Sequence, residues 1–120
     1  MRALRVLVVE DDAMIGSLLA EMLAGMGHVC AVEATEANAV AAAGRCRPHL
    51  MIVDVRLGDG SGVAAVEEIL RTGPVPHVFV SGDTAAVRAL KPNAVVMRKP
   101  FRESDLVRAM QRALGAAAGS

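Results

Sequence analysis

Short apolar segments alternate with segments of helical periodicity along the chain, and this alternation restricts the fold more than any other feature. Residues 4–9 form an apolar run with three β-branched valines and lead into three consecutive acids, as expected for a buried parallel strand with charges at its carboxyl end. Similar runs follow at residues 28–32, 50–53, 78–80 and 94–97. Apolar residues recur at helical spacing at residues 14–26, 35–45, 63–70, 84–90 and 106–114. The pattern predicts an α/β fold, a parallel sheet with helices on both faces, because each right-handed crossover lays its helix on the sheet.

The length predicts one domain. A chain of 120 residues can bury one sizeable core, and no repeat or linker interrupts this one. Because 53% of the residues are apolar and only Phe79 and Phe101 are aromatic, the core should be aliphatic. We expect a single domain over residues 1–120, with a core at about 4–114 and a flexible tail at 115–120.

Charge and hydropathy argue against two classes of partner. The formal net charge is zero, whereas a nucleic-acid binder needs an excess of basic residues to neutralise phosphates. No apolar run approaches the ~20 residues of a membrane span.

Cys30 and Cys46 are too far apart for a metal knuckle, so we expect two buried thiols in a protein of the reducing cytoplasm. His28, His49 and His77 should lie at strand starts, away from the acids, and be structural or exposed.

Polar side chains suited to phosphoryl chemistry follow the predicted strands. In an open parallel sheet, ligands bind beyond the carboxyl ends of the strands, so residues distant in sequence should meet at one edge. These residues are Glu10, Asp11 and Asp12 after the first strand, Asp54 after the third, Ser81 after the fourth and Lys99 after the fifth. Clustered carboxylates repel one another unless a hard cation lies among them, which predicts Mg²⁺. The lysine and the hydroxyl add the charge and hydrogen bonds that phosphoryl transfer needs, with one carboxylate as nucleophile.

Four segments at these positions resemble the signature segments of the CheY-like response-regulator receiver family. They are Val8–Asp12, Val53–Leu57, Val80–Gly82 and Lys99–Phe101, and the resemblance extends over nearly the whole chain. It implies a flavodoxin-like (βα)5 fold, a doubly wound parallel sheet with strand order 2-1-3-4-5. It also implies a two-component signalling module that catalyses only its own phosphorylation and dephosphorylation. A histidine kinase or histidine phosphotransfer protein would be the phosphodonor, and a separate protein would be the downstream partner of a monomer or weak dimer.

The resemblance assigns the metal site to four residues. Asp54 would be the phospho-acceptor and a ligand of Mg²⁺. Asp12 would bind the ion directly and Asp11 largely through water, and the main-chain carbonyl of Arg56 would complete the protein's share. From the residues alone, Asp12 could instead only cap the helix that follows it, which can contribute ~1 kcal/mol.

The resemblance also assigns a phosphoryl-binding pair and a switch. Lys99 would pair with the phosphoryl group, the Ser81 hydroxyl would move to hydrogen-bond it, and the peptide between Lys99 and Pro100 would be cis. Most receivers carry an aromatic switch residue three positions before the lysine, where this chain has Val96. The motif around Phe79 is similar to that of a subgroup of stand-alone receivers in which a phenylalanine on strand four takes part in switching. Simple core packing of Phe79 remains the alternative.

Other interpretations concern the loop after Asp54, the surface and the function. The loop should be loose because it contains Gly58, Gly60 and Gly62, and metal binding should order it. Basic residues of the C-terminal third could dock an acidic partner; they are Arg88, Lys91, Arg98, Arg102, Arg108 and Arg112.

A phosphatase of the haloacid dehalogenase type would need a second Asp where Arg56 stands, and a flavin-binding domain would need aromatic residues at the rim. A receiver-like adaptor that works without phosphate is a further alternative.

Overall fold

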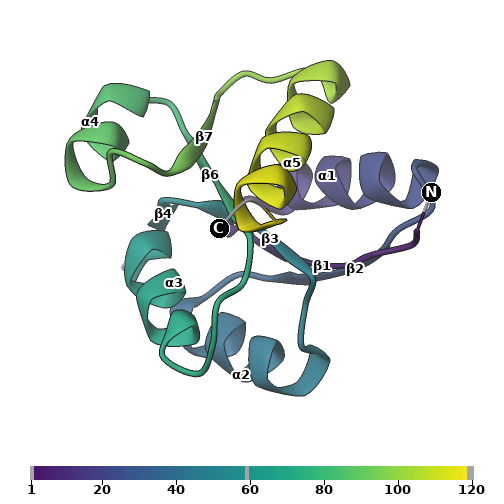
Figure 1. Cartoon of the computed structure of the whole chain (residues 1–120), viewed down its shortest axis with the longest axis horizontal. Coiled ribbons are helices and arrows are strands. Elements are labelled where there is room, and N and C mark those ends of the chain that lie inside the picture. The colour runs from purple at the N-terminus through teal and green to yellow at the C-terminus, as the bar shows by residue number, and fades with distance from the viewer. Residues whose placement is uncertain (1, 59, 119–120) are drawn as a thin grey trace.

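The computed structural model describes residues 2–58 and 60–118 and contains a five-stranded parallel sheet (Figure 1). Its strands are β1 (Arg5–Val9), β2 (Val29–Glu33), β3 (Leu50–Asp54), β6 (His77–Ser81) and β7 (Val95–Arg98). They lie in the order β2-β1-β3-β6-β7, and all four neighbouring pairs are parallel. Counted along the chain within this sheet, the order is 2-1-3-4-5, so the predicted flavodoxin-like topology is confirmed.

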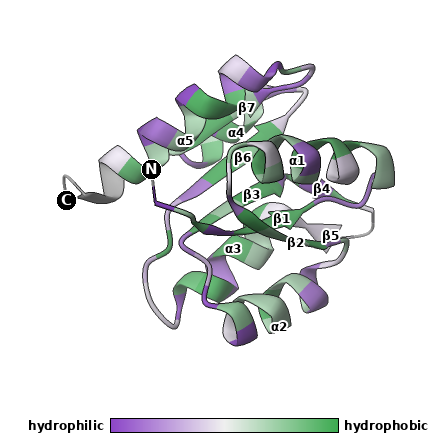
Figure 2. Cartoon of the chain, turned by 90° about the vertical axis from the view of Figure 1, so that its right-hand side faces the viewer, coloured by the Kyte–Doolittle hydropathy of each residue, from purple (hydrophilic) through white to green (hydrophobic). Residues whose placement is uncertain are grey.

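Five helices cover the two faces of the sheet, and strand alternation explains how. The helices are α1 (Ala13–Gly25), α2 (Glu36–Cys46), α3 (Gly62–Leu70), α4 (Thr84–Leu90) and α5 (Glu103–Ala118). In Figure 1, α1 and α5 lie on one side of the sheet and α2 and α3 on the other. Side chains of successive residues in each strand point to opposite faces of the sheet. Val8 and Ile52 pack with α1 and α5, whereas Val9 and Val53 pack with α2 and α3. The result is two aliphatic core layers, and Figure 2 shows hydrophobic residues concentrated along the strands between them.

Polar side chains fix the starts of four helices. The side chains of Asp12, Thr35, Ser61 and Asp83 each accept a hydrogen bond from a main-chain N–H in the first turn of α1, α2, α3 and α4. Each of these caps ends a loop that leaves the carboxyl end of a strand. The loops at this edge of the sheet are therefore short, and a capping hydrogen bond holds each of these four loops where it meets the following helix.

Two segments contain more regular secondary structure than the sequence analysis predicted. The glycine-containing loop after Asp54 forms a small antiparallel hairpin of β4 (Arg56–Leu57) and β5 (Gly60–Ser61), not a loose segment. The last helix continues to Ala118, although the sequence analysis ended it at residue 114 and expected a flexible tail. Alanine is the strongest helix former, so the alanines after Gly115 can extend the helix past it. Residues 119 and 120 lie outside the described residues.

The histidines and cysteines lie at the opposite end of the sheet from the acids or on its flanks. Nδ1 of His28 accepts a hydrogen bond from the main-chain N of Leu4, and Nδ1 of His49 accepts one from the main-chain N of Arg5. Both histidines thus hold the start of β1, as a structural role predicts. The thiols differ from the prediction, because Cys46 is exposed and Cys30 is only half-buried. No helix within residues 2–118, residue 59 aside, is both long and apolar enough to cross a membrane.

Two leucines differ in burial, so their removal should change the free energy of unfolding by different amounts. Leu106 of α5 is fully buried against the sheet, whereas Leu90 at the end of α4 is 72% exposed. Leu106→Ala should lower the free energy of unfolding by about 2–5 kcal/mol, because it removes buried contacts and leaves a cavity. Leu90→Ala should change it by only about 0.5 kcal/mol. Urea denaturation of both variants measures the difference, and equal losses would contradict this account of the core.

Candidate functional site

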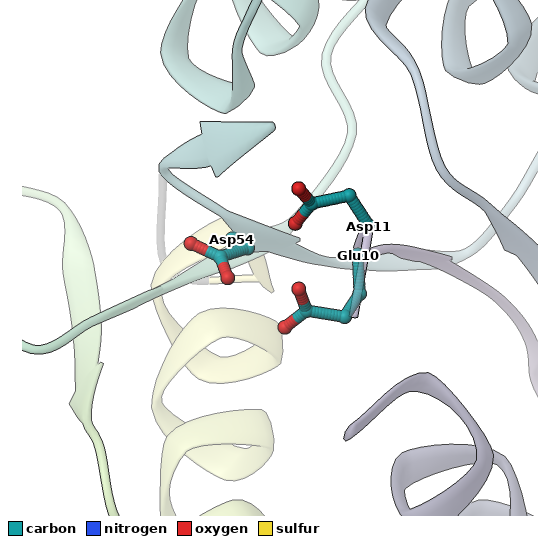
Figure 3. Close-up of side chains that lie close together, drawn as sticks. All are labelled: Glu10, Asp11 and Asp54. Carbon is teal, nitrogen blue, oxygen red and sulfur yellow. The ribbon is translucent and has the colours of Figure 1, made fainter. Parts of the chain in front are cut away.

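Four strands deliver the candidate residues to one edge of the sheet. Glu10 and Asp11 follow β1, Asp54 ends β3, Ser81 ends β6, and Lys99 follows β7. Together they line an open depression at the carboxyl ends of these strands. Figure 3 shows the side chains of Glu10 and Asp11 extending toward Asp54. One carboxylate oxygen from each of these three residues lies within 4.8 Å of the other two.

Asp54 is the centre of this arrangement. Its side chain is buried at the end of the central strand β3. Its Oδ1 atom accepts a hydrogen bond of 2.9 Å from the main-chain N of Arg56, and its Oδ2 atom is in direct contact with Nζ of Lys99. The Lys99 ammonium also lies 3.5 Å from Oε1 of Glu10. One cation therefore faces two buried carboxylates, which leaves an excess of negative charge.

Glu10 carries an unusual carboxylate. The residue is 3% exposed, and its Oε2 atom accepts a hydrogen bond of 3.1 Å from the main-chain N of Asp12. Its Oε1 atom is buried without a hydrogen bond among the described residues. Burial raises the pKa of Glu10 to about 7, the Asp12 N–H opposes the rise, and contact with Asp54 adds to it. The Lys99 ammonium lies 3.5 Å from this oxygen without forming a hydrogen bond, so a second cation beside the oxygen would be favourable.

Asp12 does not join the cluster, contrary to the sequence prediction. It is exposed, and its Oδ1 atom accepts hydrogen bonds from the main-chain N of Met14 at 2.9 Å and of Ile15 at 3.1 Å. It therefore caps α1, which was the alternative interpretation of this residue. Glu10 takes its place in the cluster. The register of β1 and β3 explains why: Val9 pairs with Val53, so the next residues, Glu10 and Asp54, leave the sheet side by side.

That register was the signal that sequence reasoning overlooked. The acid that directly follows the last buried residue of a strand stays at the sheet edge. An acid two positions later is free to begin the next helix. Asp12 and Glu10 could have been told apart by this criterion, since Asp12 precedes a helical segment by one residue.

The Ser81 hydroxyl is engaged in the turn that begins α4. Ser81 is buried, and its Oγ atom accepts a hydrogen bond of 2.9 Å from the main-chain N of Asp83 and donates one of 3.1 Å to the main-chain O of Asp83. The Lys99–Pro100 peptide is cis, as predicted. Phe79 and Val96 are paired in register on β6 and β7, and both are buried in the core layer that faces α2 and α3. The ring of His77 meets Phe79 edge-on, with centroids 5.3 Å apart.

Gly62 lies directly against the backbone of Asp54. A Cβ atom built on Gly62 would be 1.9 Å from the main-chain O of Asp54, a distance no real pair of atoms tolerates. The main-chain N of Gly62 donates a hydrogen bond of 3.0 Å to the main-chain O of Val55. The start of α3 can therefore pack against the acceptor strand only because this position lacks a side chain.

The capping role of Asp12 predicts a stability effect. Asp12→Ala should lower the free energy of unfolding by about 1 kcal/mol, because two main-chain N–H groups of α1 lose their acceptor. Asp12→Ser should recover most of this loss, since serine also caps helices well. Chemical denaturation measures both variants. An unchanged free energy of unfolding in Asp12→Ala would show that the cap is unimportant.

The raised pKa of Glu10 predicts how stability depends on pH in the metal-free protein. Between the ordinary pKa of 4.5 and the folded value of about 7, the folded state holds a proton that the unfolded state has released. Raising the pH across this window should therefore destabilise the wild type, by up to ~3 kcal/mol in total. Glu10→Gln, which cannot ionise, should lose this contribution. The test is the free energy of unfolding of both proteins at pH 5 and pH 8, and parallel pH profiles would refute it.

Comparison with known proteins identifies the family. Residues 6–111 match the family described as the response regulator receiver domain. The chain is 32% identical over 117 residues to the phyllosphere-induced regulator PhyR of Methylorubrum extorquens, covering 93% of this chain but 44% of PhyR. It is 27% identical over 114 residues to the chemotaxis protein CheY of Thermotoga maritima, covering 90% of this chain and 95% of CheY.

A solved structure agrees with these sequence matches. The solution structure of the receiver domain of the Erythrobacter litoralis PhyR response regulator superposes with a TM-score of 0.84 at 32% identity, covering 94% of this chain and 91% of that one. The fold, the sequence match and the residues gathered at the sheet edge agree. The chain belongs to the response regulator receiver domains of two-component signalling.

Proposed function

We propose that this receiver accepts a phosphoryl group on Asp54 from a histidine kinase or a histidine phosphotransfer protein and thereby changes a partner-binding surface. The contact between the Asp54 carboxylate and the Lys99 ammonium, beside two further acids, is the observation that supports the proposal. It brings together a nucleophile and a fixed positive charge, which phosphoryl transfer requires. The whole-length relatives include enzymes such as protein-glutamate methylesterases, but we propose that this chain catalyses only its own phosphorylation and dephosphorylation.

The chemistry needs little beyond positioning and charge. A carboxylate oxygen of Asp54 attacks the phosphorus of the donor, the bond from phosphorus to the donor's imidazole nitrogen breaks, and the imidazole leaves with that electron pair. The product is a mixed anhydride on Asp54. Lys99, already in contact with Asp54, would neutralise the phosphoryl oxygens, and the nearby Ser81 hydroxyl would donate a hydrogen bond to one of them.

The acidic cluster fits a hard divalent cation. Receiver domains typically bind Mg²⁺ in an acidic pocket, and the oxygen donors of Glu10, Asp11 and Asp54 are the kind that this ion prefers. The buried Oε1 atom of Glu10, which lacks a hydrogen bond, supports a cation here. We assign the site to these three carboxylates and the main-chain carbonyl of Arg56, with Glu10 in the place given to Asp12 by the sequence analysis. When bound, Mg²⁺ would neutralise the charge that develops on the phosphoryl oxygens.

The signal would pass through the turn at Ser81. Its hydroxyl cannot donate to a phosphoryl oxygen and to the main-chain O of Asp83 at the same time, because it has one proton. Phosphorylation would therefore remove a hydrogen bond from the turn that begins α4. This helix has seven residues and one buried side chain, Val87, so its position is weakly held. A shift of α4 would alter the surface that a downstream partner reads.

The phosphate chemistry is tested by intact mass. After incubation with Mg²⁺ and acetyl phosphate, the wild type should gain the mass of one phosphoryl group, about 80 Da, whereas Asp54→Ala should gain none. Lys99→Met should slow the reaction by about 100-fold, because it removes a group that stabilises the charge of the transition state.

Two results of the mass measurement would contradict the proposed phosphorylation of Asp54. An unmodified wild type that nevertheless binds Mg²⁺ would contradict phosphorylation by small donors and favour a receiver that acts as an adaptor without phosphate. An equal mass gain in Asp54→Ala would place the modification on another residue and refute the role of Asp54.

A further inference from the structure

A hydrogen bond ties the start of α2 to the hairpin beside the acceptor site. Oε1 of Glu36, the first residue of α2, accepts a hydrogen bond of 2.6 Å from the main-chain N of Ser61 in β5. The two residues are 25 positions apart in the sequence, and the bond is partly buried. A bond to an ionised acceptor is short and roughly twice as strong as one between neutral groups. This contact therefore fixes the hairpin to a helix that is not part of the site.

The hairpin is shaped to receive the Glu36 carboxylate. A Cβ atom built on Gly60 would lie 3.0 Å from Oε1 of Glu36, so the missing side chain at Gly60 leaves room for this carboxylate. On the other side of the bonded amide, Oγ of Ser61 accepts a hydrogen bond of 3.2 Å from the main-chain N of Ala64 and caps α3. Ser61 is thus held through both its main chain and its side chain.

The tether continues to Asp54 through two contacts. Ser61 pairs with Arg56 across the antiparallel hairpin. The main-chain N of Arg56 donates the 2.9 Å hydrogen bond to Oδ1 of Asp54. Two strands of two residues each are too short to be stable alone, and Gly58 and Gly60 add conformational freedom. The position of Arg56 relative to Asp54 therefore depends on what holds Ser61.

We propose that Glu36 is a positioning residue of the phosphorylation site. It does not line the depression that holds the acids, but it holds the hairpin so that the Arg56 main chain is placed for Asp54 and would be placed for the cation. The inference rests on the proposed function for its metal-binding consequence, whereas the ordering of the hairpin by Glu36 does not. Its rival is a local role, in which the Glu36 charge only stabilises the start of α2 through the helix dipole.

Glu103 provides the matched control for this rival. It is also the first residue of its helix, α5, and it is exposed. Removing its carboxylate removes the same kind of helix-dipole interaction without touching the hairpin. Gly60→Ala provides a complementary variant, because it leaves the Glu36 carboxylate in the chain but crowds it: the added Cβ would lie 3.0 Å from Oε1, so the carboxylate would have to shift by a few tenths of an ångström.

The experiment combines amide hydrogen exchange without metal with a Mg²⁺ titration followed by NMR. In the metal-free protein, Glu36→Ala and Gly60→Ala should speed exchange at the Ser61 and Arg56 amides, and Glu103→Ala should not. The Mg²⁺ concentration at half-saturation should rise by about 10-fold in Glu36→Ala, the lower end of the loss seen when groups that orient metal ligands are removed. Glu36→Gln, which keeps a neutral acceptor, should fall between Glu36→Ala and the wild type.

The outcomes separate this inference from the proposed function. Unchanged exchange at Ser61 in Glu36→Ala would overturn the tether. Faster exchange with unchanged half-saturation would overturn the positioning role, leaving a local one. A wild type that shows no response to Mg²⁺ would overturn the metal site of the proposed function and the positioning role together, while the exchange data would still decide whether Glu36 holds the hairpin.

Discussion

The contact between Lys99 and Asp54 is the interaction on which the rest of the site depends. The sheet order places the ends of β1 and β3 side by side, which brings Glu10 and Asp54 together in a buried position. Like charges at this distance, away from water, are unfavourable unless a counter-charge is near. Lys99 supplies one positive charge to both carboxylates. Burial raises the pKa of Glu10, the neighbouring Asp54 adds to the rise, and the remaining negative charge makes the pocket suited to a cation.

Such a charged cluster needs rigid surroundings, and the loops provide them through local hydrogen bonds. The loop after β1 ends at the Asp12 cap, the hairpin after β3 ends at the Ser61 cap, and the turn after β6 is closed by Ser81 and Asp83. Gly62 adds steric contact, because α3 begins against the main chain of Asp54. The caps therefore stabilise helices and also limit how far the charged side chains can move apart.

The sequence predicted the sheet well because buried parallel strands are continuous apolar runs and their polar ends are sharply marked. It also predicted that Asp54, Ser81 and Lys99 would follow adjacent strands, and the structure places them along one depression. It failed where three acids stand in a row, since the choice between Glu10 and Asp12 depends on strand register and helix capping. The position of each acid between the strand and the helix indicates the answer, but the choice of Asp12 followed the family resemblance and did not use that position.

The hairpin after Asp54 shows a second reason why part of the structure could not be predicted from the sequence. Its glycines indicate flexibility, and locally that inference is sound. The hydrogen bond that opposes this flexibility comes from Glu36, which a local window around residues 55–62 does not include. Long-range contacts of this kind are set by which helices pack together, here α2 beside α3.

The core behind Ser81 suggests how a small change at the pocket could reach the surface. Phe79 lies two residues before Ser81 on the same face of β6, and it lines a groove with Leu90 of α4. Its partner in register, Val96, is buried in the same core layer and is not one of the residues that line this groove. Phe79 is therefore the large side chain between the turn at Ser81 and α4. A shift of α4 of the kind proposed above would therefore change the packing around this ring, which makes Phe79 a candidate for coupling the pocket to the helix.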